Sequence, residues 1–356
     1  MREKEFLSKT LTPKERFLAA CFREQVDATP IWFMRQAGRY LPGYRKIRKT
    51  HEVLEIAKTP SLCEQVTMMP VEELGVDAAV MFADIMLPLE GMGVEFRIEE
   101  NVGPIISKPI KSLEDVERLK ESDPQRDVPF VLEAIKRLRT RLDKTDHALV
   151  GFSGAPFTLA SYMIEGMPSR DFTKTKQMMF DDKDAWMLLM SKLSKMVSKY
   201  LSSQVKAGVD AIQLFDSWVG ALSKEDYLKF VQPFSKEIFD HLGKDHPDTP
   251  KIHFGTNTYH LLESMRGLGD VFSVDWRTPI SSARKLLGKV AIQGNLEPAV
   301  LLSNNKNGFI AKRAQAVLDD NHGERGHIFN LGHGILRDTP VENAKFVVDY
   351  VHKNGV

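Results

Sequence analysis

Short apolar runs recur along the chain, and each of them ends in polar residues or glycine. Runs of about 4–8 apolar residues with such boundaries are typical of buried β-strands. Longer amphipathic stretches separate these runs from one another. We expect eight strands, at residues 30–34, 77–82, 147–152, 210–215, 251–254, 271–274, 290–293 and 327–331.

The stretches between the runs predict helices. Residues 12–24 begin with Thr12 and Pro13, and proline suits the first turn of a helix. In the other long stretches apolar residues recur at three- and four-residue spacing, which indicates helices with one buried face. These helices are expected at residues 60–74, 180–207, 223–242 and 340–353, with two more within 111–146 and a short hairpin within the Gly- and Pro-rich segment 86–110.

The alternation of strands and helices predicts a parallel sheet. Eight such units favour a closed (β/α)8 barrel, with an open doubly wound sheet as the alternative. No linker or break in composition divides the chain, so we expect one domain over residues 1–356, with a helical lead-in over about 1–29. Barrel enzymes carry their active sites at the C-terminal ends of the strands. The polar residues expected there are Arg35, Arg39, Asp84, Ser153, Tyr162, Ser217, His253, Asp275, Asn295 and His333.

Composition narrows the class of protein. The 356 residues are 42% hydrophobic and 27% charged, as in ordinary soluble globular proteins. A net charge of +1 provides no general basic field, so we expect no nucleic-acid partner. Only Cys21 and Cys63 are present, which fits a reducing compartment. No apolar run reaches the length of a signal peptide or membrane span, so the expected location is cytoplasmic, without membrane insertion.

The first expected strand runs directly into the segment Arg35-Gln36-Ala37-Gly38-Arg39, and Arg45 and Arg48 follow soon after. Arginine is always charged, and its planar fork binds carboxylates and phosphates. Gly38 allows the backbone to turn sharply within the segment. This arrangement indicates a binding site for a polyanion, and a surface loop rich in salt bridges is the alternative.

Two segments carry a resemblance to a known family. They are residues 30–39, PIWFMRQAGR, and residues 151–166, GFSGAPFTLASYMIEG. Both are similar to signatures of the uroporphyrinogen decarboxylase family, and the resemblance extends from about Arg16 to the C-terminus. It implies a distorted (β/α)8 barrel that commonly pairs as a homodimer and works without metal or organic cofactor. The implied reaction removes CO2 from the four acetates of uroporphyrinogen III, leaves its four propionates, and yields coproporphyrinogen III.

The resemblance also implies roles for individual residues. Asp84 would accept hydrogen bonds from the pyrrole N–H groups, although a helix N-cap is an alternative role. Arg35 and Arg39 would bind substrate carboxylates, and the three are the expected catalytic residues. The expected substrate-binding residues are Arg35, Gln36, Ala37, Gly38, Arg39, Asp84, Tyr162, Ser217 and His333, with Arg48 and Phe215 as further candidates. A surface role for Arg48 and a core role for Phe215 remain open.

Some features depart from the family pattern or suit other proteins. Val53 and Leu54 stand where the family often has Phe, and Val219 stands where a smaller residue is usual. Corrinoid methyltransferases share the fold but need a zinc site with thiolate ligands. Both cysteines here precede residue 64, and none follows a late strand, so we expect no metal site. A tetrapyrrole carrier that uses the same cleft is the non-enzymatic alternative.

Overall fold

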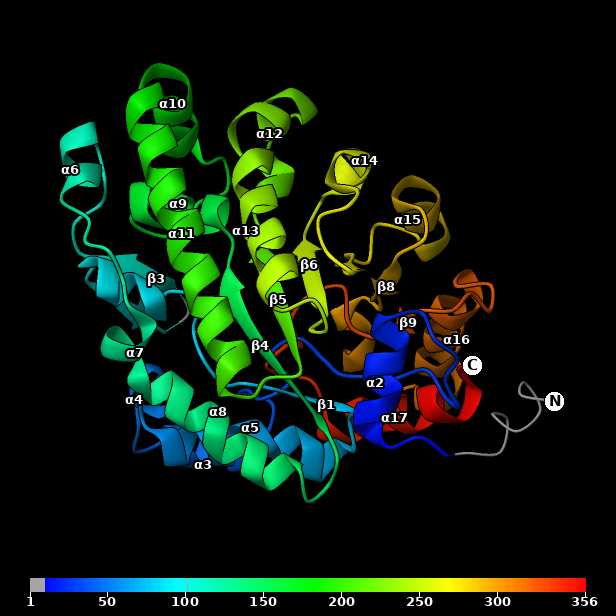
Figure 1. The fold of residues 1–356 in the computed structure, drawn as a ribbon. Coiled ribbons are helices and arrows are strands. Elements are labelled where there is room, and N and C mark those ends of the chain that lie inside the picture. The colour runs from blue at the N-terminus through cyan, green and yellow to red at the C-terminus, as the bar shows by residue number, and fades with distance from the viewer. Residues whose placement is uncertain (1–9, 101) are drawn as a thin grey trace.

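The computed structural model describes residues 10–100 and 102–356. A curled parallel sheet lies at the centre, with the strand order β1-β4-β5-β6-β7-β8-β9 (Figure 1). Each neighbouring pair in this order is parallel, as predicted. The strands are β1 (Ala78–Val80), β4 (Ala148–Gly154), β5 (Ala211–Asp216), β6 (Lys251–Gly255), β7 (Val271–Ser273), β8 (Ala291–Gln293) and β9 (His327–Ile328).

The segment at residues 30–32 lies between the two edge strands of this sheet. Ile31 forms an isolated parallel bridge with Phe329, directly after β9. The backbone N–H of Trp32 donates to the Phe329 carbonyl (3.3 Å), and that of Phe329 donates to the Pro30 carbonyl (2.8 Å). On the other side, the Asp77 N–H donates to the Ile31 carbonyl (2.9 Å), just before β1. These bonds join both edges of the sheet and favour the barrel over an open sheet.

The predicted strand at 30–34 is therefore a single bridge rather than a full strand. Its later N–H groups donate to side chains instead of a neighbouring strand. Phe33 N donates to Oε1 of Gln36 and Met34 N donates to Oδ1 of Asn330, each at 3.0 Å. The segment closes the barrel, but its backbone leaves the ladder after one residue pair.

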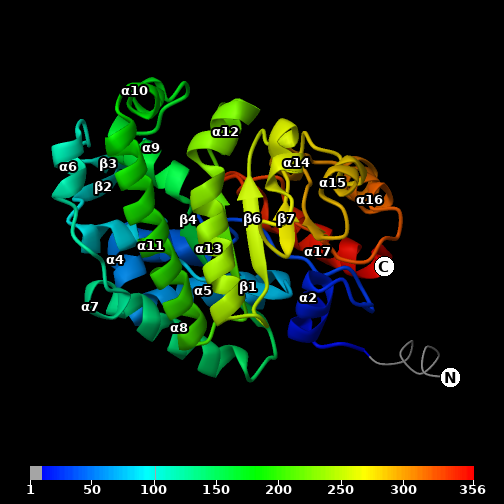
Figure 2. The same cartoon turned by 45° about the horizontal axis from the view of Figure 1, so that its top comes forward.

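Helices surround the sheet on its outer side (Figures 1 and 2). The longer ones are α2 (Pro13–Cys21), α5 (Pro60–Leu74), α8 (Pro129–Leu142), α9 (Pro156–Glu165), α10 (Thr173–Asp181), α11 (Lys183–Ala207), α13 (Gln232–Asp245), α15 (Ile280–Leu287), α16 (Ala311–Asp320) and α17 (Val341–Asn354). The shorter ones are α3 (Pro42–Arg48), α4 (Val53–Lys58), α6 (Leu113–Glu117), α7 (Pro124–Asp127), α12 (Lys224–Phe230) and α14 (Leu262–Met265). None of the helices in these described ranges is both long and apolar enough to cross a bilayer.

Several predicted helices are divided in the structure. The helix expected at 180–207 breaks at Asp182, whose side chain caps α11 by accepting from Ala185 N (3.1 Å). The helix expected at 223–242 breaks at Val231, and Pro233, which has no N–H to donate, stands in the first turn of α13. Segment 111–146 contains α6, α7 and α8 rather than two helices. The hairpin expected within 86–110 is confirmed as β2 (Phe96–Glu99) paired antiparallel with β3 (Gly103–Ile106).

The barrel interior holds a chain of buried amides. Trp32 Nε1 donates to Oε1 of Gln293 (2.9 Å). Gln293 Nε2 donates in turn to Oε1 of Gln213 and to Oγ of Ser273, each at 2.9 Å. A buried polar group costs little when it is hydrogen-bonded. The network therefore ties residue 32 to β5, β7 and β8 from the inside.

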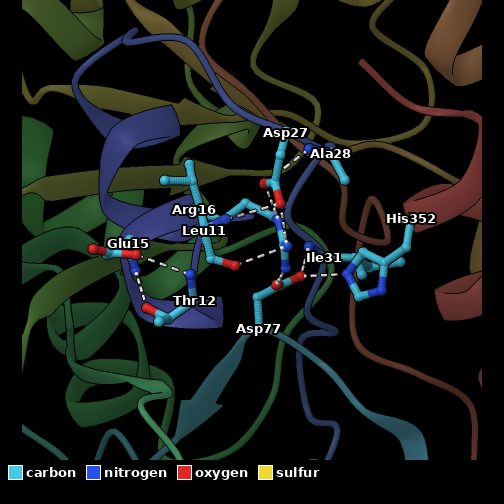
Figure 3. Close-up of polar contacts among 9 residues, drawn as sticks. All are labelled: Leu11, Thr12, Glu15, Arg16, Asp27, Ala28, Ile31, Asp77 and His352. Atoms are coloured by element: carbon cyan, nitrogen blue, oxygen red, sulfur yellow. Dashed lines mark hydrogen bonds and ion pairs between the residues drawn. The ribbon is translucent and has the colours of Figure 1, made fainter. Parts of the chain in front are cut away.

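Asp77, just before β1, is a second buried polar group that holds the segment at residues 30–32 (Figure 3). Its Oδ1 accepts from Arg16 Nη1 on α2, and its Oδ2 accepts from the Ile31 N–H, each at 2.7 Å. His352 Nε2 on α17 lies 2.7 Å from the same Oδ2. Arg16 also binds both oxygens of Asp27 at 2.8 Å. One carboxylate thus connects the lead-in, residues 30–32 (the closing segment), β1 and α17.

We infer a single domain from the packing. One connected cluster of buried apolar side chains runs from Phe17 on α2 to Val351 on α17. The helical lead-in, expected over about 1–29, begins among the described residues with α2, which is shorter than the helix predicted at 12–24. Its first part, residues 1–9, lies outside the described residues.

We predict that Asp77→Asn destabilises the fold by about 1–3 kcal/mol, because an amide has one acceptor oxygen where the carboxylate has two. Either Arg16 or the Ile31 N–H then loses its acceptor at residue 77, and Arg16 keeps Asp27 as its one carboxylate partner. The Asp77 side chain is only 1% exposed. The urea midpoint and slope of unfolding measure the effect.

Asp143→Asn is the control, because Asp143 pairs with Arg139 at 2.6 Å but is 61% exposed, and a loss below about 1 kcal/mol is expected there. Equal midpoints for the two variants would contradict the fastening role of Asp77.

Candidate active site

The loops that follow the C-terminal ends of the strands meet at one end of the barrel, which we call the mouth. In Figure 2 the arrow of β6 points toward this end, and α10, α12 and α14 stand beside it. The mouth is where a barrel of parallel strands collects side chains from many parts of the sequence. The predicted site residues follow the closing segment, β1, β4, β5 and β9.

Arg35 stands where the closing segment leaves the barrel. Its backbone has a φ of 59°, which turns the chain out of the extended conformation. Its side chain is exposed and lies over Gly334, since a Cβ on Gly334 would stand 2.4 Å from Cδ of Arg35. A side chain at residue 334 would displace the Arg35 stem from this position, so the loop after β9 and the Arg35 turn are in contact.

The rest of the arginine segment separates into buried and open parts. Gln36 is buried, and its Nε2 donates to the Ala78 carbonyl (2.8 Å) while its Oε1 accepts from the backbone. Its side chain therefore holds the shape of the turn. The backbone N–H groups of Ala37, Gly38 and Arg39 donate no hydrogen bond within the described residues. These three amides are available to a bound anion.

Arg39 and Arg48 differ in the contacts that their side chains make within the protein. Arg39 is half exposed, and its nearest carboxylate is Glu100, 3.9 Å away. Arg48 donates to the His51 carbonyl, and its Nη1 lies 3.6 Å from Oε2 of Glu52. Its side chain is 19% exposed. The structure therefore leaves Arg39 open to a ligand and ties Arg48 to its own loop.

Asp84 lies in the loop after β1. Its Oδ1 accepts from Met86 N (2.8 Å) within this loop. The short helix that follows, Leu87–Met92, has Met86 as its N-cap residue, so Asp84 is not the helix N-cap that the sequence offered as an alternative. Its Oδ2 accepts no hydrogen bond within the described residues, and the residue is partly exposed. Burial raises the pKa of Asp84, while the Met86 N–H and the charge of Arg35 oppose that rise. One carboxylate oxygen is thus held by the loop and the other is free.

Tyr162 on α9 lies near the same carboxylate. Burial raises the pKa of Tyr162 to about 12, with a further rise from Asp84 and a small opposing effect of Arg35. Its ring centroid is 4.0 Å from that of Trp218, at an interplanar angle of 37°. At neutral pH Tyr162 is therefore a protonated hydroxyl, supported by an aromatic neighbour that follows Ser217 directly.

Aromatic rings line the β5 and β6 side of the mouth. Phe215 is half buried and meets Phe152 and Phe254 edge to face, with centroids 5.4 and 5.5 Å apart. Phe254 in turn lies 6.4 Å from the ring of His333. Phe215 therefore belongs to the core and also presents part of its ring outward. Ser217 is partly exposed, and its carbonyl accepts from Thr256 Oγ1 (2.5 Å).

His333 stands on the loop after β9, two residues beyond the bridge at Leu331. Burial lowers the pKa of His333 to about 4, the charges of Arg35 and Arg277 lower it further, and Asp275 opposes them. The imidazole is therefore neutral at neutral pH, with one N–H to donate. Arg35 influences the pKa of Asp84, Tyr162 and His333 alike, so these four predicted residues are neighbours.

The other polar residues expected at strand ends make their contacts within the protein. Ser153 donates to the Gly154 carbonyl (3.1 Å). His253 lies inside β6, packed 5.1 Å from Phe239 and 5.8 Å from Phe272 between ring centroids. Asn295 Nδ2 donates to the Asp275 carbonyl (2.9 Å). Asp275 is buried as well, so all four residues are bonded or packed within the protein.

The structure adds polar residues that the sequence reasoning missed. Asp216, at the end of β5, is fully buried, and its Oδ1 accepts from Thr158 Oγ1 (3.1 Å). Burial raises the pKa of Asp216 to about 7, and the Thr158 hydrogen bond opposes that rise. Arg277 follows the expected strand 271–274 by three residues and lies two residues beyond Asp275, the polar residue expected at that strand end.

Two positions that depart from the family pattern, Val53 and Val219, lie on different elements. Val53 begins α4, and Val219 is completely buried in the turn after β5.

Burial raises the pKa of the Cys21 and Cys63 thiols, and Cys63 Sγ donates to the Phe82 carbonyl (3.2 Å). No group of three His, Cys, Asp or Glu side chains that would suit a metal ion occurs within the described residues.

Among solved structures, a methyltransferase from Methanosarcina mazei is similar, with a TM-score of 0.77 over 96% of this chain and 99% of that one. A putative vitamin-B12 independent methionine synthase from Listeria monocytogenes is more distant, with a TM-score of 0.50 over 93% of this chain and 97% of that one. The sequence identities are 21% and 12%, so these likenesses concern the fold alone.

Sequence relatives are much nearer. A uroporphyrinogen decarboxylase from Sorangium cellulosum is 49% identical over 95% of this chain and 96% of the relative. Those from Listeria monocytogenes and Thermus thermophilus are 46% and 47% identical, over 97% and 94% of this chain and 97% of each relative. The model of the uroporphyrinogen decarboxylase (URO-D) family matches residues 12–354. With its fold, its signatures and residues 12–354 in agreement, the chain belongs to the uroporphyrinogen decarboxylase family.

Proposed function

We propose that the mouth of the barrel removes CO2 from the four acetates of uroporphyrinogen III and releases coproporphyrinogen III. The observation that carries this proposal is the free Oδ2 of Asp84, one negative group beside Arg35 and the neutral donors Tyr162 and His333. Such a site suits a substrate with donors at its centre and carboxylates around its edge. A macrocycle of four pyrroles bearing eight carboxylates has that distribution.

Decarboxylation requires a place for the electron pair of the broken C–C bond. Protonation of a pyrrole at a ring carbon makes a cation that accepts this pair when CO2 leaves. A second proton then completes the methyl group, and the proton on the ring carbon leaves to restore the pyrrole, so each acetate takes up one proton in total. The substrate itself acts as the electron sink, and the family resemblance implies that no cofactor takes part.

Asp84 would hold the macrocycle from its centre. The four pyrrole N–H groups reach one carboxylate oxygen when the flexible ring domes around it. Hydrogen bonds to a charged group contribute about 1.5–3 kcal/mol each. The same negative charge stabilises the cation formed by ring protonation, and because the loop after β1 already holds it, no reorganisation is needed during the reaction.

The other residues would act on the edge of the ring. Arg35 and Arg39 bind carboxylates through their planar forks, and the backbone amides of residues 37–39 add donors beside them. Tyr162 and Ser217 offer hydroxyls, and neutral His333 offers one N–H. Phe215 packs against a pyrrole face. Gln36 keeps the turn in place, and Arg48 supports its own loop through His51 and Glu52.

We also propose that the protein works in the cytoplasm as a homodimer. Two buried, unpaired cysteines fit a reducing compartment. The dimer follows from the family resemblance. Analytical ultracentrifugation of the purified protein measures this association directly.

The experiment that tests the function is anaerobic incubation of metal-stripped protein with uroporphyrinogen III, with products separated by carboxylate number. Successive seven-, six-, five- and four-carboxylate products are expected. Tight binding without turnover would favour a carrier instead. Absence of both, together with zinc-dependent transfer from a methylated corrinoid, would favour a methyltransferase.

Asp84→Asn keeps the shape of the side chain and removes its charge. We predict that turnover falls by at least about 100-fold, as for loss of one preorganised electrostatic group, while the thermal midpoint changes little. Asp143→Asn, on the exposed end of α8, is the matched control and should keep full turnover. Near wild-type turnover in Asp84→Asn would rule out the central anchor.

The pH profile supplies a second measurement on the same residue. Because burial raises the pKa of Asp84 and the reaction needs its charged form, activity is lost as the pH falls through that raised value. We therefore expect the acid limb of kcat/KM to lie above the ordinary Asp value of about 3.9. An acid limb at or below that value would contradict the raised pKa.

His333 is predicted to remain neutral between about pH 5.5 and 8, since burial lowers its pKa to about 4. Protonation then favours the unfolded chain, so its contribution to stability declines as the pH falls from about 6.5 toward 4. NMR titration of histidine-labelled protein measures the state directly, and loss of one signal in His333→Gln assigns it. A His333 signal that titrates near pH 6.5 would show that the site does not exclude the charge.

A further inference from the structure

Arg277 is a cation at the end of β7 to which the proposed reaction gives no role. Its guanidinium carbon lies 3.9 Å from the ring centroid of Trp276. Its Nη1 lies 3.0 Å from Oδ2 of Asp275, and the Arg277 side chain is 49% exposed. A long, flexible side chain is thus held in one place on its own loop while its face remains open to solvent.

We propose that Arg277 binds a carboxylate of the substrate at the rim of the mouth, beside His333. The inference rests on the proposed function of the mouth, and it concerns a subsite that neither signature segment contains. Its ligand is a peripheral carboxylate of a tetrapyrrole polyanion, either an acetate or a propionate.

The donor capacity of Arg277 supports this role. A guanidinium has five N–H donors in a fixed fork. One bond goes to Asp275, and Nε and Nη2 make no hydrogen bond within the described residues. Stacking on Trp276 and the ion pair orient the group before a ligand arrives, which lowers the entropy lost on binding.

The position of Arg277 supports it as well. The loops after β7 and β9 lie against each other, because a Cβ on Gly332 would stand 2.3 Å from the Trp276 backbone N. His333 is the next residue along that loop. Arg277 and Arg35 are both among the charges that act on His333. The two guanidiniums therefore share the surroundings of one proposed substrate-binding residue.

The charge of the substrate provides the third reason. Eight carboxylates exceed what Arg35 and Arg39 can bind with two planar forks. The net charge of +1 means that no general positive field makes up the difference. A further oriented arginine at the mouth meets this need locally.

The alternative is that Arg277 only neutralises Asp275. Asp275 is 1% exposed and also accepts from Asn257 N (2.6 Å) and from the backbone N of Arg277 (2.9 Å). Those two bonds remain when the guanidinium is removed. The loop should therefore survive Arg277→Gln, which makes the substitution a usable test.

The experiment compares Arg277→Gln with a matched control, Arg137→Gln. Arg137 on α8 is 46% exposed and pairs with Glu64 through one 2.8 Å contact, on the helical layer outside the sheet. For Arg277→Gln we expect a rise of about tenfold in KM and in the Kd for uroporphyrinogen III, which corresponds to one charge-assisted contact. Arg137→Gln should stay within about twofold of the unmodified protein.

Arg277→Lys is the second variant, because it keeps a charge beside Asp275 and loses the fork. We expect an intermediate rise in KM with an unchanged thermal midpoint. If Arg277→Gln fails to fold, Arg277→Lys decides the matter on its own. Unchanged KM and Kd in whichever of the two variants folds, or the same change in Arg137→Gln, would overturn the inference.

Binding of coproporphyrinogen III identifies the carboxylate, because that product retains only propionates. Weaker binding of both compounds to Arg277→Gln would assign a propionate. Weaker binding of uroporphyrinogen III alone would assign an acetate. Because Kd is measured by rapid mixing, before the first turnover is complete, a failure of the Arg277 subsite is distinguishable from a failure of the decarboxylase function, which the unmodified protein tests.

Discussion

The closed barrel depends on how one short segment is held between two strands. Residues 30–32 contribute a single bridge and a few backbone bonds, too few to fix their register alone. Asp77 supplies the rest, since its buried carboxylate binds Arg16 and the Ile31 N–H at once. Inside the barrel, Trp32 is bonded to Gln293. Polar groups on both sides therefore hold a segment that strand pairing alone would leave loose.

This closure determines where the arginine segment begins. Because residue 32 is held in the barrel wall, the turn at Arg35 falls at the mouth, over Gly334. Gln36 then returns its side chain to the interior and binds the Ala78 carbonyl. The turn is thus fastened at its base while Arg35 and Arg39 stay exposed. A binding loop gains from such a rigid base, since little ordering remains to be done when a ligand binds.

The mouth has two opposing electrostatic requirements within a small space. In the proposed function, it must attract a substrate with many negative charges and still keep one carboxylate of its own ionised. The structure meets both demands by placing arginines where solvent reaches them and Asp84 where burial and Arg35 act against each other. Tyr162 and His333 remain uncharged at neutral pH, because burial raises the pKa of the first to about 12 and lowers that of the second to about 4. In the proposed function, neutral donors beside a charged anchor would let the site bind carboxylates without neutralising Asp84.

The sequence by itself determined the architecture, because strands and helices depend on local patterns, and its two signature segments indicated the family. Apolar runs placed all seven strands of the sheet, and the residues following them included Arg35, Asp84 and His333. The sequence missed the break at Val231, which depends on where Pro233 falls in the helix, and the division of residues 111–146 into three helices. Only the tertiary structure decided that Gln36 faces inward, that His253 packs between phenylalanines, and that Arg277 stands beside His333. Those outcomes depend on which loops meet across the barrel, and contacts between residues distant in the chain leave no periodic trace in the sequence.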